Sequence, residues 1–421
     1  AIMDIYRLAL ENDAGIAAAE ASLAAGRETI VQGRSLLMPS INLGADYTKV
    51  EMDISYSDPF FVPGGLINYI SKGYTLSLIQ PLFRMETLAV YAQAKLMTHQ
   101  SEIEHSLARQ ELILIVARAY FEVLMAEDNL NFIHAQKEAI AEQLAHAKLA
   151  FEIGRTSITD THEAQARFDL VKSQEILAEN RRHISRESLQ KIIDEKPGRI
   201  ARLSDKLPLE PPDSNEMEYW VEKAEQNNLR LKIVMDGVMI AKKEMERNRG
   251  ARYPALNIVA AYDFESADGG PFNVGSDTAT QTVGLQLNMP LFTGGGLSSK
   301  IRAAQANYQK ALYEKEDALR MVRLQTRETF LLVKSGISQV LALQQALLSS
   351  RSSMASTKRG FEVGMRTGVD VLNAQQQFFR VKRDLAQTRY GYLLSRLQLK
   401  AIAGILKDED IEEINGLLEK K

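Results

Sequence analysis

The side chains that most often carry out chemistry are absent or scattered in this sequence. The 421 residues contain no cysteine, which excludes disulfides, thiolate metal sites and cysteine nucleophiles. No Ser/His/Asp set shows a local catalytic signature, so we expect no catalytic site and no enzymatic activity. None of the six histidines has a second histidine four residues away or a cysteine beside it, so we predict no metal site. These histidines are His99, His105, His134, His146, His162 and His183.

One glycine-rich run suggests a phosphate-binding loop. Residues 293–300 follow a strand-like segment and precede a helical one, as such a loop does. The run lacks the GxxxxGK[ST] spacing, and the equivalent residues 83–85 in the first half have no glycine. We therefore interpret it as a joint between a strand and a helix, and expect no cofactor. The acidic pair Asp408 and Asp410 near the C-terminus is most simply a solvated helix face.

Two related segments each place a carboxylate shortly after a glycine. They are FEIGRTSITD, which ends at Asp160, and FEVGMRTGVD, which ends at Asp370. Gly154 and Gly364 have the position of helix C-caps at the tips of two helical hairpins. One interpretation is that the two aspartates N-cap the helices that follow. The other is that they form a charged functional site, and the two roles can coexist.

These segments belong to a longer duplication. RSLLMPSINLGADY is echoed by RNRGARYPALNIVAAYDF, and YTLSLIQPLF is echoed by VGLQLNMPLF, at the same offset of roughly 210 residues. We therefore predict two structurally similar repeats, residues 1–200 and 217–404. A linker rich in proline and charge, residues 197–216, joins them, and residues 405–421 form a short C-terminal segment.

Each repeat contains two segments in which apolar and polar residues alternate. Leu256, Ile258 and Ala260 share one face, whereas Asn257 and Asp263 lie on the other. This period is typical of a half-buried strand in an ordinary antiparallel sheet. It is equally typical of a barrel strand with lipid outside and water inside. The predicted strands are residues 41–50, 74–80, 256–265 and 280–289, with exposed hairpin loops at 51–73 and 266–279.

The remaining sequence predicts very long helices. Residues 84–151 contain neither proline nor glycine, and at ~1.5 Å per residue a helix of this length extends on the order of 100 Å. Its apolar positions, such as Leu112 and Val116, recur three and four residues apart, which is the pattern of a coiled-coil seam. We expect two antiparallel helical hairpins, residues 84–196 and 296–403.

Composition and hydropathy limit how the chain can meet a membrane. No apolar stretch reaches the ~18 residues of a membrane helix, so a membrane-spanning form would have to be a closed β-barrel. Four strands cannot close a barrel, but three copies would supply twelve. The net charge of −3 gives no electrostatic reason to expect nucleic acid as a partner. The first residues already form a charged amphipathic pattern, so we expect any export signal to have been removed.

Several motifs, in order and in duplicate, resemble the TolC family of outer-membrane efflux and secretion channels over nearly the whole chain. They are LMPSINLGADY, QPLF, AQKEAI, ITD, ARYPALN, MPLFTGG and RTGVDVLNAQQ. The resemblance implies a mainly helical fold with a small β part, in which long antiparallel coiled-coil hairpins accompany four strands per protomer. It further implies a homotrimer with a 12-stranded β-barrel in outer-membrane lipid and an α-helical barrel in the periplasm. Because the chain has no cysteine that could carry a lipid anchor, it resembles the non-lipidated members of the family.

The same resemblance implies a function and partners. The trimer would be the passive exit duct of a tripartite efflux pump or a type I secretion system. It would dock to a periplasmic adaptor (membrane fusion) protein and to an inner-membrane pump of the RND, ABC or MFS class. A periplasmic coiled-coil adaptor is the alternative, although two hairpins and duplicated strands argue against it. A diffusion porin would consist mostly of strands.

The family also implies a gate at the periplasmic tip, closed by polar bonds and bounded by a ring of aspartates. By motif, the gate residues are Thr159, Asp160, Phe361 and Arg366, the cation-selectivity ring lies at Asp370 and Asn373, and the tip turns that contact the adaptor are Gly154 and Gly364. Two positions depart from the family pattern. Phe361 replaces a tyrosine and Asn373 replaces a second aspartate, so one hydroxyl link and one acidic ring are missing.

Elementary electrostatics agrees with such a gate. An exposed pair between Asp160 and Arg366 contributes only ~0–1 kcal/mol, so three symmetric copies form a latch that an adaptor can break. Three Asp370 carboxylates that converge on one axis would repel one another and attract cations.

Overall fold

The computed structural model describes residues 1–55, 65–204, 207–270 and 274–419. The chain folds into two compact units. The first comprises Ala1–Ala21, Ile103–Lys232 and Asp317–Lys421, and the second comprises Ser22–Glu102 and Ile233–Glu316. Each unit takes segments from both predicted repeats, so the division in space runs across the duplication in sequence.

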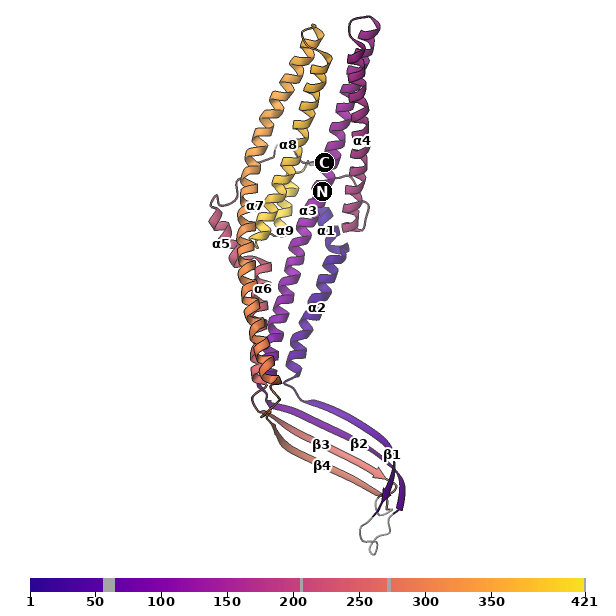
Figure 1. The fold of residues 1–421 in the computed structure, drawn as a ribbon, viewed down its shortest axis with the longest axis vertical. Helices are drawn as coiled ribbons and strands as arrows, with labels where there is room; N and C mark the ends of the chain where they lie inside the picture. Colours follow the sequence, from indigo (N-terminus) through magenta and orange to yellow (C-terminus); the bar gives the residue numbers. More distant parts are fainter. Residues whose placement is uncertain (56–64, 205–206, 271–273, 420–421) are drawn as a thin grey trace. The chain divides into compact units, whose positions relative to one another are not determined.

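The second unit contains one antiparallel sheet with the strand order β1-β2-β3-β4 (Figure 1). The strands are β1 (Ser40–Ile54), β2 (Gly65–Phe83), β3 (Ala255–Ala267) and β4 (Ser276–Asn288). All except β4 extend further than predicted at both ends, and much of the expected loop at residues 51–73 is strand. The alternation of apolar and polar residues weakens toward the strand ends. The pairing of β1 with β2 nevertheless continues as far as Ile54, which lies opposite Gly65. The rest of that loop, residues 56–64, and residues 271–273 of the second loop lie outside the described residues.

The register of the strands gathers the apolar side chains on one face of the sheet. Leu43 pairs with Leu76, and Leu76 pairs with Tyr262. On this face the ring of Tyr74 stacks on that of Phe264, with centroids 5.3 Å apart. Opposite residues of an antiparallel pair project to the same side, so a register shift of one residue would destroy this face.

The other face of the sheet is polar. The Thr75 hydroxyl donates to Asp263 Oδ1 at 2.6 Å, and the Ser71 hydroxyl donates to Glu265 Oε1 at 2.7 Å. Within the described residues the apolar face remains uncovered, and Val283 of β4 is 82% exposed. An uncovered apolar face on a long antiparallel sheet fits lipid or another protein better than water.

Two shorter helices, α2 (Ala14–Ser35) and α6 (Leu229–Gly250), precede the two strand pairs. Within the second unit, α2 packs closely against the helix Met85–Glu152. A side chain on Gly26 would not fit there, because its Cβ would lie 2.3 Å from Ser101 Oγ. The Thr98 hydroxyl donates to the Gly26 carbonyl at 3.0 Å. On α6, Asp236 Oδ2 lies 2.7 Å from His99 Nδ1. These contacts hold the helical part of the unit together.

The long helices end within a few residues of the predicted bounds. They are α3 (Met85–Glu152), α4 (Ile158–Ile193), α7 (Gly296–Glu362) and α8 (Gly368–Ile402). Figure 1 shows α4 returning beside α3, and α8 returning beside α7. The fold class is therefore confirmed as mainly helical, with long antiparallel hairpins and one small sheet.

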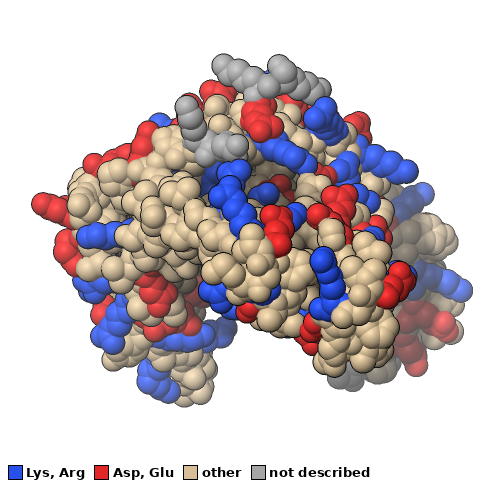
Figure 2. Space-filling view, turned by 90° about the horizontal axis from the view of Figure 1, so that it is seen from above, with Lys and Arg blue, Asp and Glu red and all other residues tan. Residues whose placement is uncertain are grey.

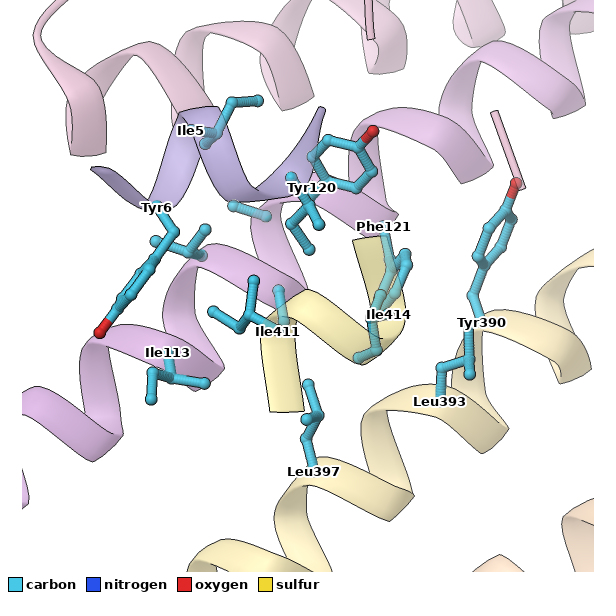
Figure 3. Close-up of a cluster of buried hydrophobic side chains, with 14 of the residues drawn as sticks. Ile5, Tyr6, Ile113, Tyr120, Phe121, Tyr390, Leu393, Leu397, Ile411 and Ile414 are labelled. Atoms are coloured by element: carbon cyan, nitrogen blue, oxygen red, sulfur yellow. The ribbon is translucent and has the colours of Figure 1, made fainter. Parts of the chain in front are cut away.

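Aromatic and aliphatic side chains from several helices form the core of the first unit (Figure 3). Tyr120 and Phe121 of α3 and Leu393 of α8 are all completely buried or nearly so. The rings of Phe121 and Tyr390 lie 5.6 Å apart, which links the first hairpin to the second. The helix α1 (Ile2–Asn12) adds further apolar residues to this core.

The predicted linker is attached to the first unit by buried groups. The Tyr120 hydroxyl donates to the carbonyl of Ala201, and that of Tyr392 donates to the carbonyl of Glu210, each at 2.7 Å. Leu203 is buried and forms an isolated antiparallel bridge with Leu418. The helix α5 (Met217–Asn227) follows this segment.

The C-terminal acidic helix α9 (Asp408–Gly416) is not simply a solvated face, in contrast to our expectation. Its Ile411 and Ile414 are buried in the core. Its acidic side chains pair with the hairpins: Asp410 lies 2.5 Å from Lys400 Nζ. The Tyr6 hydroxyl donates to Asp408 at 2.7 Å, and burial together with this carboxylate raises the pKa of Tyr6 to about 12.

One helix in the described part of the chain, α7, is long and apolar enough to cross a membrane, contrary to our prediction from the sequence. The reason is that residues 330–348 carry a single charge, Lys334, and have apolar residues on more than one face. Only 11% of the qualifying window is buried, and Leu341 and Leu348 are exposed. A helix that packs against other helices can have the same length and composition, so these two properties do not by themselves make α7 a membrane helix.

Candidate functional site at the hairpin tips

Both hairpins turn through the same backbone motif. Gly154 and Gly364 adopt left-handed φ angles of 71° and 78°. In the first tip the N–H of Arg155 donates to the carbonyl of Ala150 at 2.8 Å, and in the second the N–H of Met365 donates to that of Gly360 at 2.7 Å. The N–H groups of Gly154 and Gly364 donate to the carbonyls three residues earlier, at 2.9 and 3.0 Å, which completes the Schellman arrangement that ends a helix. The glycines therefore occupy C-cap positions, as their spacing predicted.

The aspartates are not the N-caps of the returning helices, so that structural interpretation was wrong by three residues. Ser157 caps α4 and Thr367 caps α8, because these residues have the extended backbone that an N-cap requires. Asp160 and Asp370 lie in the first helical turn instead. Thr159 lies two residues after the first cap, and its N–H donates to Ser157 Oγ at 3.2 Å.

Asp370 closes a capping box at the start of α8. The N–H of Thr367 donates to Asp370 Oδ2 at 2.9 Å, while the N–H of Asp370 donates to Thr367 Oγ1 at 3.2 Å. These bonds favour the charged carboxylate, so the N–H and the hydroxyl of Thr367, and then the charge of Arg366, lower the pKa of Asp370. Asp370 is therefore a firmly ionised, solvent-facing group.

A groove of about 820 Å³ lies between the two hairpin tips. It brings together three of the residues expected in a gate, Asp160, Phe361 and Arg366, and also Gly364. Thr159, Asp370, Asn373 and Gly154 do not line it.

The expected bond between Asp160 and Arg366 is not made inside one chain. Asp160 accepts a hydrogen bond from the Thr156 hydroxyl. In the described part of the chain, no ion pair joins Asp160 to Arg366. The charge of Arg366 instead acts on Asp370 of its own tip. Asp160 and Arg366 thus both line the groove, each engaged within its own tip.

The hairpins are joined by a residue that the sequence reasoning missed, Arg167 on α4. Its Nη1 donates to Gln376 Oε1 at 2.8 Å and its Nη2 donates to Asn373 Oδ1 at 3.4 Å, both on α8. Glu163, one turn earlier, holds the same guanidinium at 3.1 Å. Asn373 is therefore an acceptor for a neighbouring arginine, a role that its neutral amide can fill.

A second link joins the first helices of the two hairpins, α3 and α7. Lys358 Nζ on α7 lies 3.2 Å from Glu142 Oε1 on α3. The residue pairs in both links are separated by 206 to 216 positions, close to the repeat offset of roughly 210. The duplication was the signal that could have found them, because it brings equivalent positions of the two hairpins side by side.

Two amide side chains are buried in the groove. Gln143 and Gln375 are each only 7% exposed. Within the described residues, Gln375 Oε1 has no hydrogen-bond partner. A buried acceptor left unpaired costs about 1–3 kcal/mol, so Gln375 is a polar group that the fold of one chain does not satisfy.

Comparison with known proteins decides the family. The model of the outer membrane efflux protein family matches residues 5–194 and 220–405. The chain belongs to the outer membrane efflux protein family. It is 33% identical to the outer membrane protein TolC of Vibrio cholerae over 417 residues, which cover 99% of this chain and 93% of that protein. It is also 30% identical to the proteases secretion protein PrtF of Dickeya chrysanthemi, covering 98% and 90% of the two chains.

The fold of this efflux-family protein is also found in solved structures. The outer membrane protein VceC of Vibrio cholerae superimposes with a TM-score of 0.80 at 18% identity, covering 96% of this chain and 97% of that one. The resemblance to TolC-type channels is thus confirmed. The protein is an outer-membrane channel of the kind used in efflux and type I secretion, with a β part in the membrane and a helical part in the periplasm. The alternative of a periplasmic adaptor is set aside.

Proposed function

We propose that three copies of this chain form a passive exit duct that is gated at the hairpin tips and has no catalytic site. The observation that carries the proposal is a set of surfaces that a single chain leaves uncovered. In the sheet, β1 and β4 are edge strands, each with a row of backbone groups that have no partner strand. Lipid cannot satisfy such groups, whereas a ring of three sheets pairs every edge and gives twelve strands.

The helices support the same assembly. Leu170, Leu177 and Ile184 of α4 are spaced seven residues apart and are 53%, 66% and 50% exposed. A heptad stripe that remains exposed is the contact surface of a coiled coil whose partner helix is absent. On α7 the exposed Leu341 and Leu348 have the same spacing. We infer that these stripes meet helices of neighbouring copies.

The gate would combine bonds within chains and between them. Arg366 of one copy pairs with Asp160 or Thr159 of the next, while Arg167 holds the two hairpins of each copy together. Phe361 supplies an apolar contact in place of a hydroxyl link. The three Asp370 carboxylates form the cation-selective ring, and Asn373 contributes no charge to it. Each exposed pair contributes ~0–1 kcal/mol, so the closed state is stable but can be opened by a partner.

The partners follow from the family and from the groove. The duct would receive cargo from an inner-membrane pump of the RND, ABC or MFS class through a periplasmic adaptor that contacts the tips near Gly154 and Gly364. The unpaired Gln375 acceptor and the small side chains Ala139, Ala147 and Ala150 in the groove suit a closely packed partner helix. Relatives named for protease secretion and for efflux leave both kinds of cargo open.

The test is single-channel conductance of the detergent-extracted protein in a planar lipid bilayer, together with its mass in detergent. We expect a trimer with a small, cation-preferring conductance. Replacing Arg366 with Ser should enlarge the conductance, because the bond between neighbouring tips is lost. An unchanged conductance would remove Arg366 from the gate, and the absence of both insertion and trimer would refute the duct.

A further inference from the structure

A second cavity, of about 400 Å³, lies apart from the tips between α3, α4 and the segment that follows α4. Basic side chains dominate its lining. Arg182, His183 and Arg186 come from α4, and Arg202 comes from the following segment. Glu127 of α3 is the one acidic residue among the lining residues that the structure describes.

The carboxylate of Glu127 is already engaged. Arg186 Nη1 donates to Glu127 Oε1 at 2.7 Å. Its Nη2 donates to the carbonyls of Pro197 and Gly198 at 2.7 and 3.1 Å. Arg186 is therefore fixed in place, and it ties the end of α4 to the segment that carries Arg202.

The other two guanidinium groups have no acidic partner in the described part of the chain. Arg182 Nη2 lies 3.5 Å from His183 Nε2, a contact that brings no negative charge. Three guanidinium groups and one carboxylate leave an excess of two positive charges around one cavity. Positive charges that line one cavity repel one another, and a bound anion would remove this repulsion.

We propose that this cavity is a binding site for an oxyanion that carries at least two anionic oxygens, such as a phosphate or a dicarboxylate. A guanidinium presents its N–H groups as a planar fork that matches carboxylate and phosphate oxygens, and such bonds are roughly twice as strong as neutral ones. Arg182 and Arg202 provide two such forks from different segments of the chain. The Asn131 amide, which also lines the cavity, can add a donor.

The arrangement differs from a chance group of surface arginines in two respects. The residues line an open hollow of about 400 Å³, and one of the arginines, Arg186, is held by three hydrogen bonds. A bound oxyanion would bridge α4 and the segment after it. It would therefore lock the junction between the first hairpin and the predicted linker.

The experiment is isothermal titration calorimetry of the detergent-extracted protein at constant ionic strength. Sodium phosphate is the probe in one arm and sodium glutarate in the other, with sodium chloride as the reference. We expect one saturable site per chain. Saturation by phosphate alone assigns a phosphate ligand, and saturation by glutarate assigns a carboxylate ligand.

Variants locate the binding site. Arg182→Gln and Arg202→Gln should each weaken binding at least tenfold, and the double variant should abolish it. Arg181→Gln is the matched control, since Arg181 is an exposed arginine on the same helix that does not line the cavity. Circular dichroism and mass in detergent verify that each variant is folded. The proposal fails if neither anion gives a saturable heat, or if Arg181→Gln weakens binding as much as Arg182→Gln does. The calorimetric result does not depend on channel conductance, so it can fail independently of the proposed duct.

Discussion

The aspartates at the hairpin tips have a local role that does not depend on any partner chain. Asp370 closes the capping box of α8, and Asp160 accepts a bond from Thr156 at the start of α4. At Asp370 the bonds from Thr367 also favour the charged carboxylate and lower its pKa. Capping and gating are therefore compatible at the same residue.

The titration of Asp370 gives a prediction at this scale. Its folded pKa lies below the ordinary value of 3.8, because the N–H and hydroxyl of Thr367 favour the charged form. The capping contribution is thus fully present above pH 3.8 and is lost as the pH falls through the lower folded pKa. In Thr367→Ala the hydroxyl is lost, so the pKa should rise and cation preference should disappear at a higher pH than in the wild type.

The measurement is the reversal potential under a KCl gradient as the pH is lowered. Thr367→Ser, which retains a hydroxyl, is the control and should titrate like the wild type. Identical titrations of Thr367→Ala and the wild type would show that the hydroxyl does not control the charge of Asp370.

Arg167 gives the second prediction for a single side chain. Arg167→Gln removes the charge-assisted bonds to Gln376 and Asn373, at a cost of about 1 kcal/mol per chain. The closed state should lose roughly fivefold in population relative to the open one for each chain. Lys172→Gln, an exposed change on the same helix, should leave single-channel open probability unaltered. Equal effects of both substitutions would argue against a link at Arg167.

At the scale of the element, each hairpin depends on a tight turn that only glycine adopts without strain. Both tips combine a left-handed glycine with an N-capped returning helix, so each hairpin end is determined by four or five local residues. This local determination explains why the lengths of α3 and α7 were predictable. It also means that a tip can be disturbed without unfolding the hairpin.

Gly154→Ala tests this turn. The left-handed conformation costs an L-residue roughly 1–2 kcal/mol, so amide hydrogen exchange across residues 150–160 should accelerate about tenfold. Gly198→Ala is the matched control, since Gly198 does not have a positive φ and has open space around its Cα. Exchange that is unchanged at the tip would mean that the turn tolerates a side chain.

At the scale of the whole molecule, the surface of one chain is incomplete. Apolar side chains remain exposed on the sheet and along α4 and α7, including Val283, Leu177 and Leu348. On the face seen in Figure 2, acidic and basic side chains are interspersed, which fits the small net charge of −3. Association through apolar stripes is thus better supported than association through charge.

Leu177→Asp tests the proposed interface on α4. Placing a carboxylate in an apolar helix–helix seam should convert the trimer to monomers, while the helix content stays the same because Leu177 packs little within its own chain. Lys172→Asp, an exposed position outside the stripe, should remain trimeric. Sedimentation in detergent separates the two outcomes, and a Leu177→Asp trimer would place the interface elsewhere.

The sequence by itself determined the features that depend on neighbouring residues. Helix length, the capping glycines and the alternation of the strands all follow from local patterns, and most were predicted closely. The tertiary structure decided which distant residues meet: Arg167 with Gln376, Asp410 with Lys400, and the buried linker residue Leu203. Arg167 and Gln376 are separated by nearly the repeat offset, but the other two contacts follow neither the duplication nor the hydrophobic period. A hydrophobic pattern specifies which face of an element is apolar but not which element covers it.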